Sequence, residues 1–341
     1  MKHGIACIAR ALALAVFTLG AGAPPAAADP PVAIAIHAGA GTMSRAELSA
    51  GREQEIRTAL AAAVRAGHDV LANGGSSLDA VTHAVQMLED TPFFNAGRGA
   101  VFNAEGRHEL DASIMNGADL DAGAVAGVHN VRNPILLARR VMTDSVHVML
   151  SGAGAEAFAR EQDIAFADDA YFHTDYRWQQ LLEARAAAAG RDAANEPSPD
   201  RWLSTVGAVA LDRAGNLAAA TSTGGMTNKR WGRIGDAPII GAGTYADNRS
   251  CAVSATGHGE YFIRATVARD ICARVQFTGV TLERAADEVI NGQLRAMGGD
   301  GGIIAVDRHG NIALTFNTSG MYRARIGTDG QLFVGIYRDE D

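Results

Sequence analysis

The fold is decided by one stretch, Ser204–Met226, which reads Ser-Thr-Val-Gly-Ala-Val-Ala-Leu-Asp-Arg-Ala-Gly-Asn-Leu-Ala-Ala-Ala-Thr-Ser-Thr-Gly-Gly-Met. Two apolar runs flank a polar turn at 212–216, a pattern typical of a β-hairpin. If Leu211 pairs with Leu217, Thr205 falls opposite Thr223, because opposed residue numbers in an antiparallel pair have a constant sum. We therefore expect two hydroxyls to meet at the open end of the hairpin.

Thr205 gains a chemical role if the chain is cut between Ser204 and Thr205. A threonine hydroxyl is a weak nucleophile unless a base accepts its proton, and a threonine at a chain start carries that base as its own α-amine. The pKa of an α-amine is about 7.7–8.0, so a useful fraction is neutral near pH 7. The alternative is an ordinary cross-strand threonine pair without chemistry, and the hairpin alone favours that alternative.

Length and composition narrow the class of protein. The 341 residues suit one large domain or two. The formal net charge is −8 at pH 7 and Lys and Arg form no dense run. This composition argues against nucleic acid or a membrane surface as a partner.

Residues 1–28 have the pattern of a signal peptide. Lys2 and Arg10 precede the apolar stretch Ala11–Leu19, and small residues follow up to Ala28. The apolar stretch is too short for a permanent membrane anchor. Cleavage after Ala28 predicts a periplasmic or secreted protein.

Two cysteines, Cys251 and Cys272, remain once Cys7 has left with the signal peptide. An oxidising compartment permits a disulfide between them. Cys251 is expected in a strand and Cys272 inside an amphipathic helix. We therefore expect two separate buried thiols.

Apolar periodicity divides the remaining chain into strands, helices and one linker. Besides the hairpin, strands are expected at Val32–His37, Ala100–Asn103, Glu109–Met115, Ala122–Val128, His147–Leu150 and Cys251–Thr256. A long helix is expected from Ser44 or Glu47 to about Leu71. Further helices are expected at Ser77–Glu89, Pro134–Met142, Ala155–Glu161, Glu260–Val275 and Leu282–Met297. Residues 167–203 are polar and Ala-rich and end in a Pro-containing run, which predicts a mobile linker or a helix followed by a tail.

The hairpin is duplicated later in the chain. Gly302–Met321 repeats the pattern of Gly207–Met226 at a constant offset, and Asp300 stands where the first copy has Thr205. Related strands with a single active edge, flanked in sequence by helices, predict an α+β fold of stacked sheets with outer helix layers.

Two further places carry groups suited to amino-acid chemistry. Thr256 and Gly257 precede a helix start, where backbone N–H groups can stabilise an oxyanion, although a tight turn that needs glycine is the alternative. His258 follows and is expected to be exposed. Arg233 and Asp236 match the carboxylate and the ammonium of an amino-acid main chain, with a solvated surface pair as the alternative.

Asn95 lies in the loop Phe94-Asn-Ala-Gly97, where it can donate to a substrate or backbone carbonyl or serve as a turn residue. The sequence has no metal-binding Cys or His spacing, no phosphate loop and no Gly-x-Ser-x-Gly motif. Metal-assisted hydrolysis is therefore not expected.

Taken together, these residues resemble the threonine-dependent N-terminal nucleophile asparaginases, also called isoaspartyl peptidases or plant-type L-asparaginases. The resemblance covers nearly the whole chain after the signal peptide. Its motifs are Ile36–Gly41, Phe94–Gly97, Thr205–Asp212, Thr221–Lys229, Gly232–Asp236, Gly241–Gly243 and Thr256–Glu260.

The resemblance implies a four-layer αββα sandwich and a precursor that cleaves itself between Ser204 and Thr205. The products would be an α chain of 29–204 and a β chain of 205–341, assembled as a dimer of αβ units, which is a heterotetramer. Thr205 would be the nucleophile and its amine the base. The other implied roles are nucleophile support by Thr223 and Asn95, an oxyanion hole of Thr256 and Gly257, and a substrate pocket of Arg233, Asp236, Gly257 and Gly259.

The resemblance implies no cofactor for the chemistry, but it does imply a structural sodium ion. Its ligands would be the main-chain carbonyls of Leu88, Glu89, Thr91, Phe94, Ala96 and Arg98, as suits a hard cation. Two positions depart from the family pattern. Ser204 stands where glycine usually precedes the nucleophile, and Ala38 replaces the first glycine of a His-Gly-Gly turn.

The implied reaction is hydrolysis of the side-chain amide of L-asparagine, or of the β-carbonyl link of an isoaspartyl dipeptide, through a β-aspartyl ester on Thr205. One alternative is a glycosylasparaginase acting on N-acetylglucosaminyl-asparagine. The other is a non-enzymatic periplasmic amino-acid-binding protein that uses Arg233 and Asp236 without cleavage.

Overall fold

The computed structural model describes residues 1, 30–41, 43, 45–46, 48–189 and 205–340. The predicted signal peptide from residue 2 onward, with its cleavage site, lies outside these ranges, as do Ser204 and residues 190–203 of the predicted linker.

The strands and helices follow one another along the chain as one mixed α+β set. The strands are β1 (Ala33–Gly41), β2 (Leu110–Asn116), β3 (Ala122–Val128), β4 (Met149–Ser151), β5 (Val206–Leu211), β6 (Leu217–Thr223), β7 (Thr244–Ala246), β8 (Cys251–Gly257), β9 (Gly301–Asp307), β10 (Ile312–Phe316), β11 (Gly320–Ile326) and β12 (Leu332–Tyr337). The helices are α1 (Ala50–Ala72), α2 (Ser77–Glu89), α3 (Pro134–Asp144), α4 (Gly152–Glu161), α5 (Asp169–Phe172), α6 (Asp175–Ala189), α7 (Gly259–Ala265), α8 (Val267–Thr278) and α9 (Leu282–Asp287).

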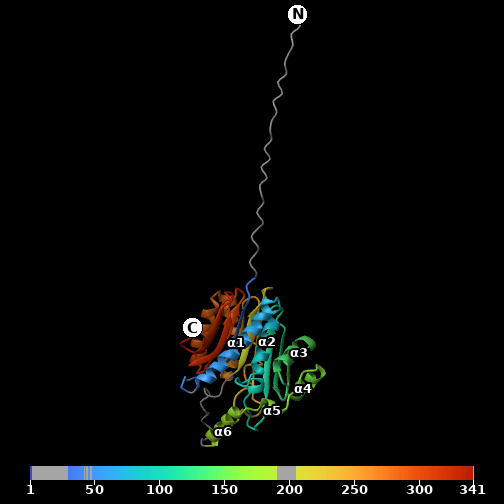
Figure 1. The fold of residues 1–341 in the computed structure, drawn as a ribbon, viewed down its shortest axis with the longest axis vertical. Helices are drawn as coiled ribbons and strands as arrows, with labels where there is room; N and C mark the ends of the chain where they lie inside the picture. The colour runs from blue at the N-terminus through green and yellow to red at the C-terminus, as the bar shows by residue number, and fades with distance from the viewer. Residues whose placement is uncertain (2–29, 42, 44, 47, 190–204, 341) are drawn as a thin grey trace.

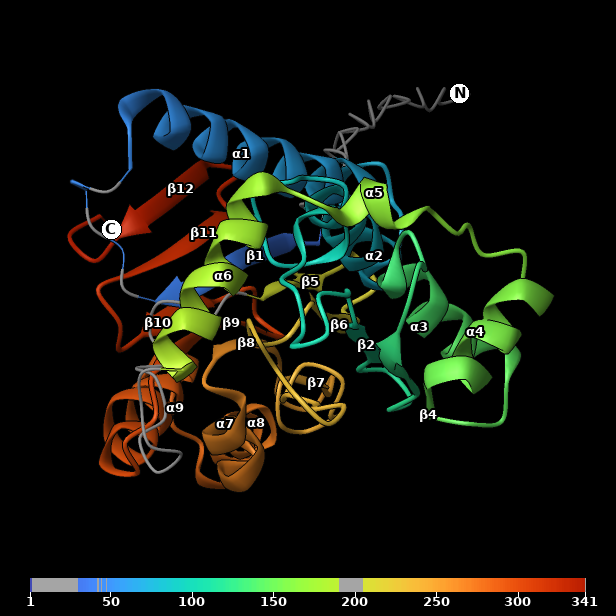
Figure 2. The same cartoon turned by 90° about the horizontal axis from the view of Figure 1, so that it is seen from below.

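Two β-sheets lie against each other, and α1 and α2 lie side by side over the larger one (Figure 1). The larger sheet has the order β12-β11-β1-β5-β6-β2-β3-β4, and the smaller has the order β10-β9-β8-β7. Figure 2 shows α1 and α2 beyond the larger sheet and α7, α8 and α9 on the opposite side, beyond the smaller one. None of the helices in the described ranges combines the length and the apolar character needed to cross a membrane.

The central hairpin has the expected register. β5 and β6 pair with Leu211 opposite Leu217 and Val206 opposite Ser222, which continues to Thr205 opposite Thr223. The duplicated hairpin is β9–β10, and it lies in the smaller sheet. The prediction of stacked sheets built from related strands is confirmed.

The inner face of the hairpin changes character along its length. Because side chains alternate between the two faces of a strand, the odd-numbered residues of β5 and β6 point toward the smaller sheet. Val209 and Ala219 join the apolar cluster between the two sheets. Thr221 and Thr223 lie on the same face nearer the open end, which is therefore lined by hydroxyls.

Three predicted elements differ from the structure. Ala100–Asn103 is a loop, and its backbone bonds are isolated ones such as Asn103 N to Arg107 O at 2.8 Å. The helix expected at Glu260–Val275 is two helices, because Thr266 adopts a left-handed φ of 49° between α7 and α8. The last helix continues from α9 as a π-helix at Glu288–Leu294, a wider turn that periodicity cannot reveal.

The first part of the predicted linker is helical. α5 spans Asp169–Phe172 and α6 spans Asp175–Ala189. Arg177 and Leu181 of α6 are buried. The Arg177 Nε–H donates to the carbonyl of Gly99 at 2.9 Å. Of the two alternatives, a helix followed by a tail fits residues 167–189 better than a mobile linker does.

Cys251 and Cys272 form a disulfide, so the expectation of two separate thiols is wrong. Their Cα atoms lie 5.4 Å apart. α8 packs directly on β8, which brings the first residue of the strand next to the helix. Membership in two different elements does not separate two cysteines when those elements pack against each other.

Replacing both cysteines with alanine is expected to lower the free energy of unfolding. The bridge joins residues 21 positions apart, and a cross-link over a loop of this size stabilises by about 3 kcal/mol. Thermal unfolding with and without reductant measures the effect. An identical midpoint for wild type and the double variant would contradict it.

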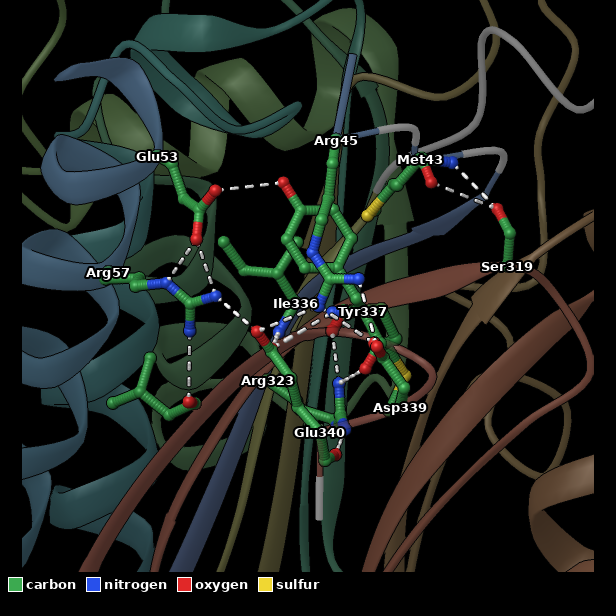
Figure 3. A network of polar contacts seen from close by, with 12 residues as sticks. Met43, Arg45, Glu53, Arg57, Ser319, Arg323, Ile336, Tyr337, Asp339 and Glu340 are labelled. Carbon is green, nitrogen blue, oxygen red and sulfur yellow. Dashed lines mark hydrogen bonds and ion pairs between the residues drawn. The ribbon is translucent and has the colours of Figure 1, made fainter. Parts of the chain in front are cut away.

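A polar network fastens the C-terminal residues to α1 (Figure 3). Arg57 of α1 contacts Glu53 at 2.7 Å and Glu340 at 2.5 Å. The Glu340 carboxylate accepts from the backbone N–H of Ile336 at 2.6 Å, and the Tyr337 hydroxyl donates to Glu53 at 3.1 Å. This network lies on the α1 side of the larger sheet, away from the hydroxyl-lined face.

Candidate active site

The two threonines of the hairpin meet at its open end. Thr205 Oγ1 donates to Thr223 Oγ1 at 3.1 Å, and both residues are buried. Thr223 Oγ1 also accepts from the N–H of Gly225 at 3.0 Å. The contact expected from the register is present, and the turn after β6 holds one of its partners.

Asn95 is fully buried and binds the same turn. Its Nδ2 donates to the carbonyl of Gly225 at 2.7 Å, and its Oδ1 accepts from the N–H of Val101 at 2.9 Å. A side chain on Gly224 would lie 2.6 Å from Asn95 Oδ1, so only glycine fits there. Asn95 therefore holds the turn that follows Thr223.

Thr256 and Gly257 end β8 beside the start of β9. Gly257 has a φ of +152°, and a Cβ at this position would lie 2.7 Å from the Cα of Gly301. The Thr256 hydroxyl accepts from the N–H of Ala40 at 3.4 Å. This backbone conformation requires glycine, so the tight-turn alternative and an oxyanion role are compatible at this position.

Arg233, Asp236 and Gly259 converge on one point. A Cβ on Gly259 would lie 2.8 Å from Asp236 Oδ1 and 2.9 Å from Arg233 Nη2. Asp236 is buried, and its Oδ2 has no hydrogen-bond partner among the described residues. Arg233 is largely covered, with its side chain 18% exposed, and both charged groups face Gly259. This placement argues against a solvated surface pair.

Burial raises the pKa of Asp236 to about 7, although the positive charge of Arg233 lowers it. An ammonium bound to this carboxylate would stabilise the ionised form, because an opposite charge lowers the pKa of an acid. The ionised form of Asp236 is therefore costly in this buried position.

Glu260 orients the guanidinium of Arg233 and was not among the predicted site residues. Arg233 Nε and Nη2 donate to its two carboxylate oxygens at 2.9 Å and 2.8 Å. A guanidinium has five N–H donors, and this contact uses two of them. The sequence shows that Glu260 lies three residues after Gly257, on the first turn of α7. Its pairing with Arg233, however, depends on how the loop packs.

Glu260→Gln is expected to raise KM roughly 3- to 10-fold and leave kcat unchanged, because a neutral amide orients the fork less firmly than a bidentate carboxylate. Steady-state kinetics on a β-aspartyl dipeptide measure this. Glu288→Gln, which loosens the exposed Arg284–Glu288 pair of 2.8 Å, is the matched control. A fall in kcat at constant KM would contradict the orienting role.

Asp111 is a second residue that the sequence reasoning missed. It lies on β2 directly opposite Thr223, and its Oδ1 accepts from the N–H of Gly127 at 2.8 Å. Burial raises its pKa, while Lys229 and Arg233 lower it. Its strand was predicted, but no sequence signal showed that this strand pairs with β6.

His258 is less exposed than expected. Its side chain is only 12% exposed and lies 3.4 Å from Glu260, with its ring against the edge of Tyr261. Glu260 and Tyr261 of α7 cover most of the ring, so the flanking glycines do not make this side chain highly exposed.

The loop after α2 turns its carbonyls toward two glycines. A Cβ on Gly97 would lie 2.5 Å from the carbonyl oxygen of Glu89, and one on Gly99 would collide with that of Phe94. The backbone therefore closes tightly around oxygen atoms, which are the ligands that a hard cation prefers. The sodium ion implied by the resemblance stays a prediction for this loop.

Comparison with known proteins agrees with this geometry. A family model described as asparaginase matches residues 30–336. The chain is 52% identical over 309 residues to the isoaspartyl peptidase of Escherichia coli K12, covering 90% of this chain and 96% of the relative. It is 52% identical over 310 residues to that of Salmonella typhimurium (90% and 98%) and 41% identical over 325 residues to a probable isoaspartyl peptidase/L-asparaginase of Arabidopsis thaliana (89% and 98%).

These matches define the class of protein as a hydrolytic enzyme. The chain belongs to the asparaginase family.

Proposed function

We propose that this protein is an autoprocessing hydrolase that cleaves β-aspartyl dipeptides and the side-chain amide of L-asparagine. The observation that carries the proposal is the 3.1 Å contact between Thr205 and Thr223 at the start of β5. The clamp of Arg233, Asp236 and Gly259 supports the choice of substrate, as do the relatives named isoaspartyl peptidase.

Processing comes first. Thr205 Oγ attacks the carbonyl carbon of Ser204, and the peptide nitrogen of Thr205 leaves as the new α-amine, so that the acyl group moves from nitrogen to oxygen. Water then hydrolyses the resulting ester and releases the Ser204 carboxylate. Thr205 thereby starts the β chain with its own base beside its hydroxyl.

Substrate hydrolysis then takes two steps. The amine accepts the proton of Thr205 Oγ as the oxygen attacks the β-carbonyl, and it passes this proton to the leaving nitrogen when the C–N bond breaks. Water attacks the β-aspartyl ester, gives its proton to the same amine, and Thr205 leaves as a hydroxyl. The N–H of Gly257 and the hydroxyl of Thr256 are the donors that we assign to the oxyanion.

The clamp explains how one site accepts several leaving groups. Arg233 would hold the α-carboxylate of the aspartyl head and Asp236 its α-ammonium, both by charge-assisted hydrogen bonds. Neither residue would contact the leaving amine in this arrangement. Ammonia and amino acids should therefore both serve as leaving groups.

We further propose four features of the mature protein. The arrangement of helices and sheets is the four-layer αββα sandwich of N-terminal nucleophile hydrolases. A structural sodium ion lies on the carbonyls of the loop after α2. The signal peptide directs the chain to the periplasm or the exterior, in agreement with the disulfide. Two αβ units assemble into a heterotetramer.

A denaturing gel tests processing directly. Purified protein should give two bands, and mass spectrometry of the smaller fragment should find Thr205 at its N-terminus. A single intact band after prolonged incubation would favour the amino-acid-binding alternative instead.

Comparison of two substrates tests specificity. β-Aspartyl-leucine should be hydrolysed efficiently, whereas N-acetylglucosaminyl-asparagine should be a poor substrate. Activity confined to the sugar substrate would assign the protein to the glycosylasparaginases.

A further inference from the structure

His37 of β1 binds the backbone of the nucleophile. Its Nδ1 lies 2.9 Å from the carbonyl oxygen of Thr205, and its Nε2 lies 2.9 Å from the hydroxyl of Ser254. The residue is fully buried. His37 belongs to the motif Ile36–Gly41, but the sequence assigned no role to its side chain.

Beyond Ser254, a chain of buried hydroxyls continues between the two sheets. Ser254 Oγ lies 2.7 Å from Thr221 Oγ1, and Thr244 Oγ1 donates to Thr221 Oγ1 at 2.5 Å. Ser113 Oγ lies 2.7 Å from Thr244 Oγ1 and 2.6 Å from the carbonyl oxygen of Ala237. The chain therefore starts at the carbonyl of Thr205 and ends at the residue that follows Asp236.

The protons of this chain have a defined direction. A carbonyl oxygen only accepts, so Nδ1 of His37 must donate to Thr205. Burial lowers the pKa of His37 to about 3, and this effect is larger than that of the Thr205 hydrogen bond, which raises the pKa. The ring is therefore neutral near pH 7, and Nε2 accepts a hydrogen bond. Ser254 then donates to His37, Thr221 to Ser254, and Thr244 to Thr221. The single proton of Ser113 is shared between Thr244 Oγ1 and the carbonyl oxygen of Ala237.

Gly207 provides the space for the first link. It lies opposite His37 in the β1–β5 pair. A Cβ at this position would collide with Ser254 Oγ and lie 2.5 Å from His37 Nε2. Glycine is disfavoured inside a strand because it has no side chain to pack. Here it admits the His37–Ser254 hydrogen bond.

We propose that His37 is a positioning residue that holds the nucleophile in register with the substrate clamp through this hydroxyl chain. The proposal rests on the proposed role of Thr205. Once the peptide before Thr205 is cut, that residue has no covalent anchor on its N-terminal side. His37 holds the carbonyl of Thr205, and five buried side chains, His37 included, link this carbonyl to Ala237. This link then limits the movement of Thr205 relative to Asp236.

The test compares variants that remove one or both bonds of His37. In His37→Leu both bonds are lost, and kcat per processed chain should fall roughly 10²-fold with little change in KM, because a small displacement of reacting groups has this effect. His37→Asn keeps a donor near Thr205 and should retain roughly a tenth of kcat or more. Ser254→Ala keeps the histidine and should lose kcat roughly 3- to 10-fold.

Arg57→Gln is the matched control, since it cuts the network on the other face of the larger sheet. It should lower the midpoint of thermal unfolding and leave kcat unchanged. Each variant is assayed with β-aspartyl-leucine, and the processed fraction is read from the N-terminal Thr205.

A ¹⁵N spectrum of the imidazole in the wild type should show a proton on Nδ1 and none on Nε2.

The outcomes separate the two proposals. A wild-type protein that hydrolyses nothing defeats the proposed function. An active wild type beside a His37→Leu variant with normal kcat defeats the positioning role alone. If His37→Leu fails to fold, Ser254→Ala decides, and a normal kcat there overturns the proposal. The positioning role would also be overturned if Arg57→Gln and Ser254→Ala lost the same stability and the same kcat.

Discussion

Thr205→Ala is expected to yield one uncut chain with no measurable β-aspartyl hydrolysis. The substitution removes the atom that attacks in both processing and turnover, and loss of a catalytic nucleophile lowers kcat on the order of 10⁶-fold in a hydrolase. The fold should persist, because Thr205 contributes one hydroxyl contact at the edge of the hairpin. A gel, a thermal melt and a kinetic assay together measure the result.

Thr205→Ser is the matched control for this prediction. Serine keeps the hydroxyl and the amine but lacks the methyl group that restricts rotation of the side chain. Processing and turnover should be slower than in wild type but well above those of the alanine variant. Full hydrolysis by an uncut Thr205→Ala protein would show that another group carries the reaction.

Asp236→Asn is expected to lower kcat/KM for β-aspartyl-leucine roughly 10²–10³-fold, because truncating one partner of a buried charge pair costs 2–5 kcal/mol. Steady-state kinetics measure this effect. Processing should be unaffected, since the clamp is assigned to the substrate alone. A variant that is slow in both reactions would instead indicate a structural role for Asp236.

The same substitution should change the pH dependence. The pKa of Asp236 is about 7 in the unliganded protein, and binding of an ammonium needs the ionised carboxylate. In wild type, kcat/KM should therefore rise as the pH increases through 7. In Asp236→Asn this contribution should disappear, which leaves the rise that is due to the amine of Thr205.

Asp236→Asn should also be more stable than wild type above pH 7. Since the pKa is higher in the folded than in the unfolded chain, the folded state binds more protons between about pH 4 and 7, and stability is lost as the pH rises through this window. Above it, ionised Asp236 costs on the order of a few kcal/mol. An amide avoids that cost, so the melting temperature at pH 8 should increase.

Asp212→Asn is the contrasting control for stability. Its Oδ1 accepts from the N–H groups of Ala214 and Asn216, and its Oδ2 accepts from that of Ser77 at 2.9 Å. An amide nitrogen would face one of these donors and lower the melting temperature. If both aspartate variants lose stability, the cost assigned to burying ionised Asp236 is wrong.

Several parts of the site were predicted from local patterns. The spacing of the hairpin placed Thr205 opposite Thr223, since a turn of known length fixes which residues face each other. Arg233 and Asp236 are three residues apart in one loop, so their meeting needed little information from the rest of the chain. The duplicated hairpin similarly predicted two related sheets.

The parts that were missed depend on pairs distant in the sequence. His37 and Ser254 are 217 residues apart, and their contact exists because β1 and β8 lie in sheets that face each other. The disulfide has the same origin, since it joins a strand to the helix packed on it. Alternation shows which face of a strand a residue occupies, but it does not show what lies across that face.

By itself, the sequence determined the hairpin, its register, the pair of threonines and the charged residues suited to an amino acid, because turns and alternation act over a few residues. The tertiary structure alone decided that Asp111 lies beside Thr223, that Glu260 holds Arg233, and that a hydroxyl chain joins His37 to Ala237. The physical reason is that strand order and sheet-to-sheet packing are chosen by the burial of the whole core, and no local pattern records that choice.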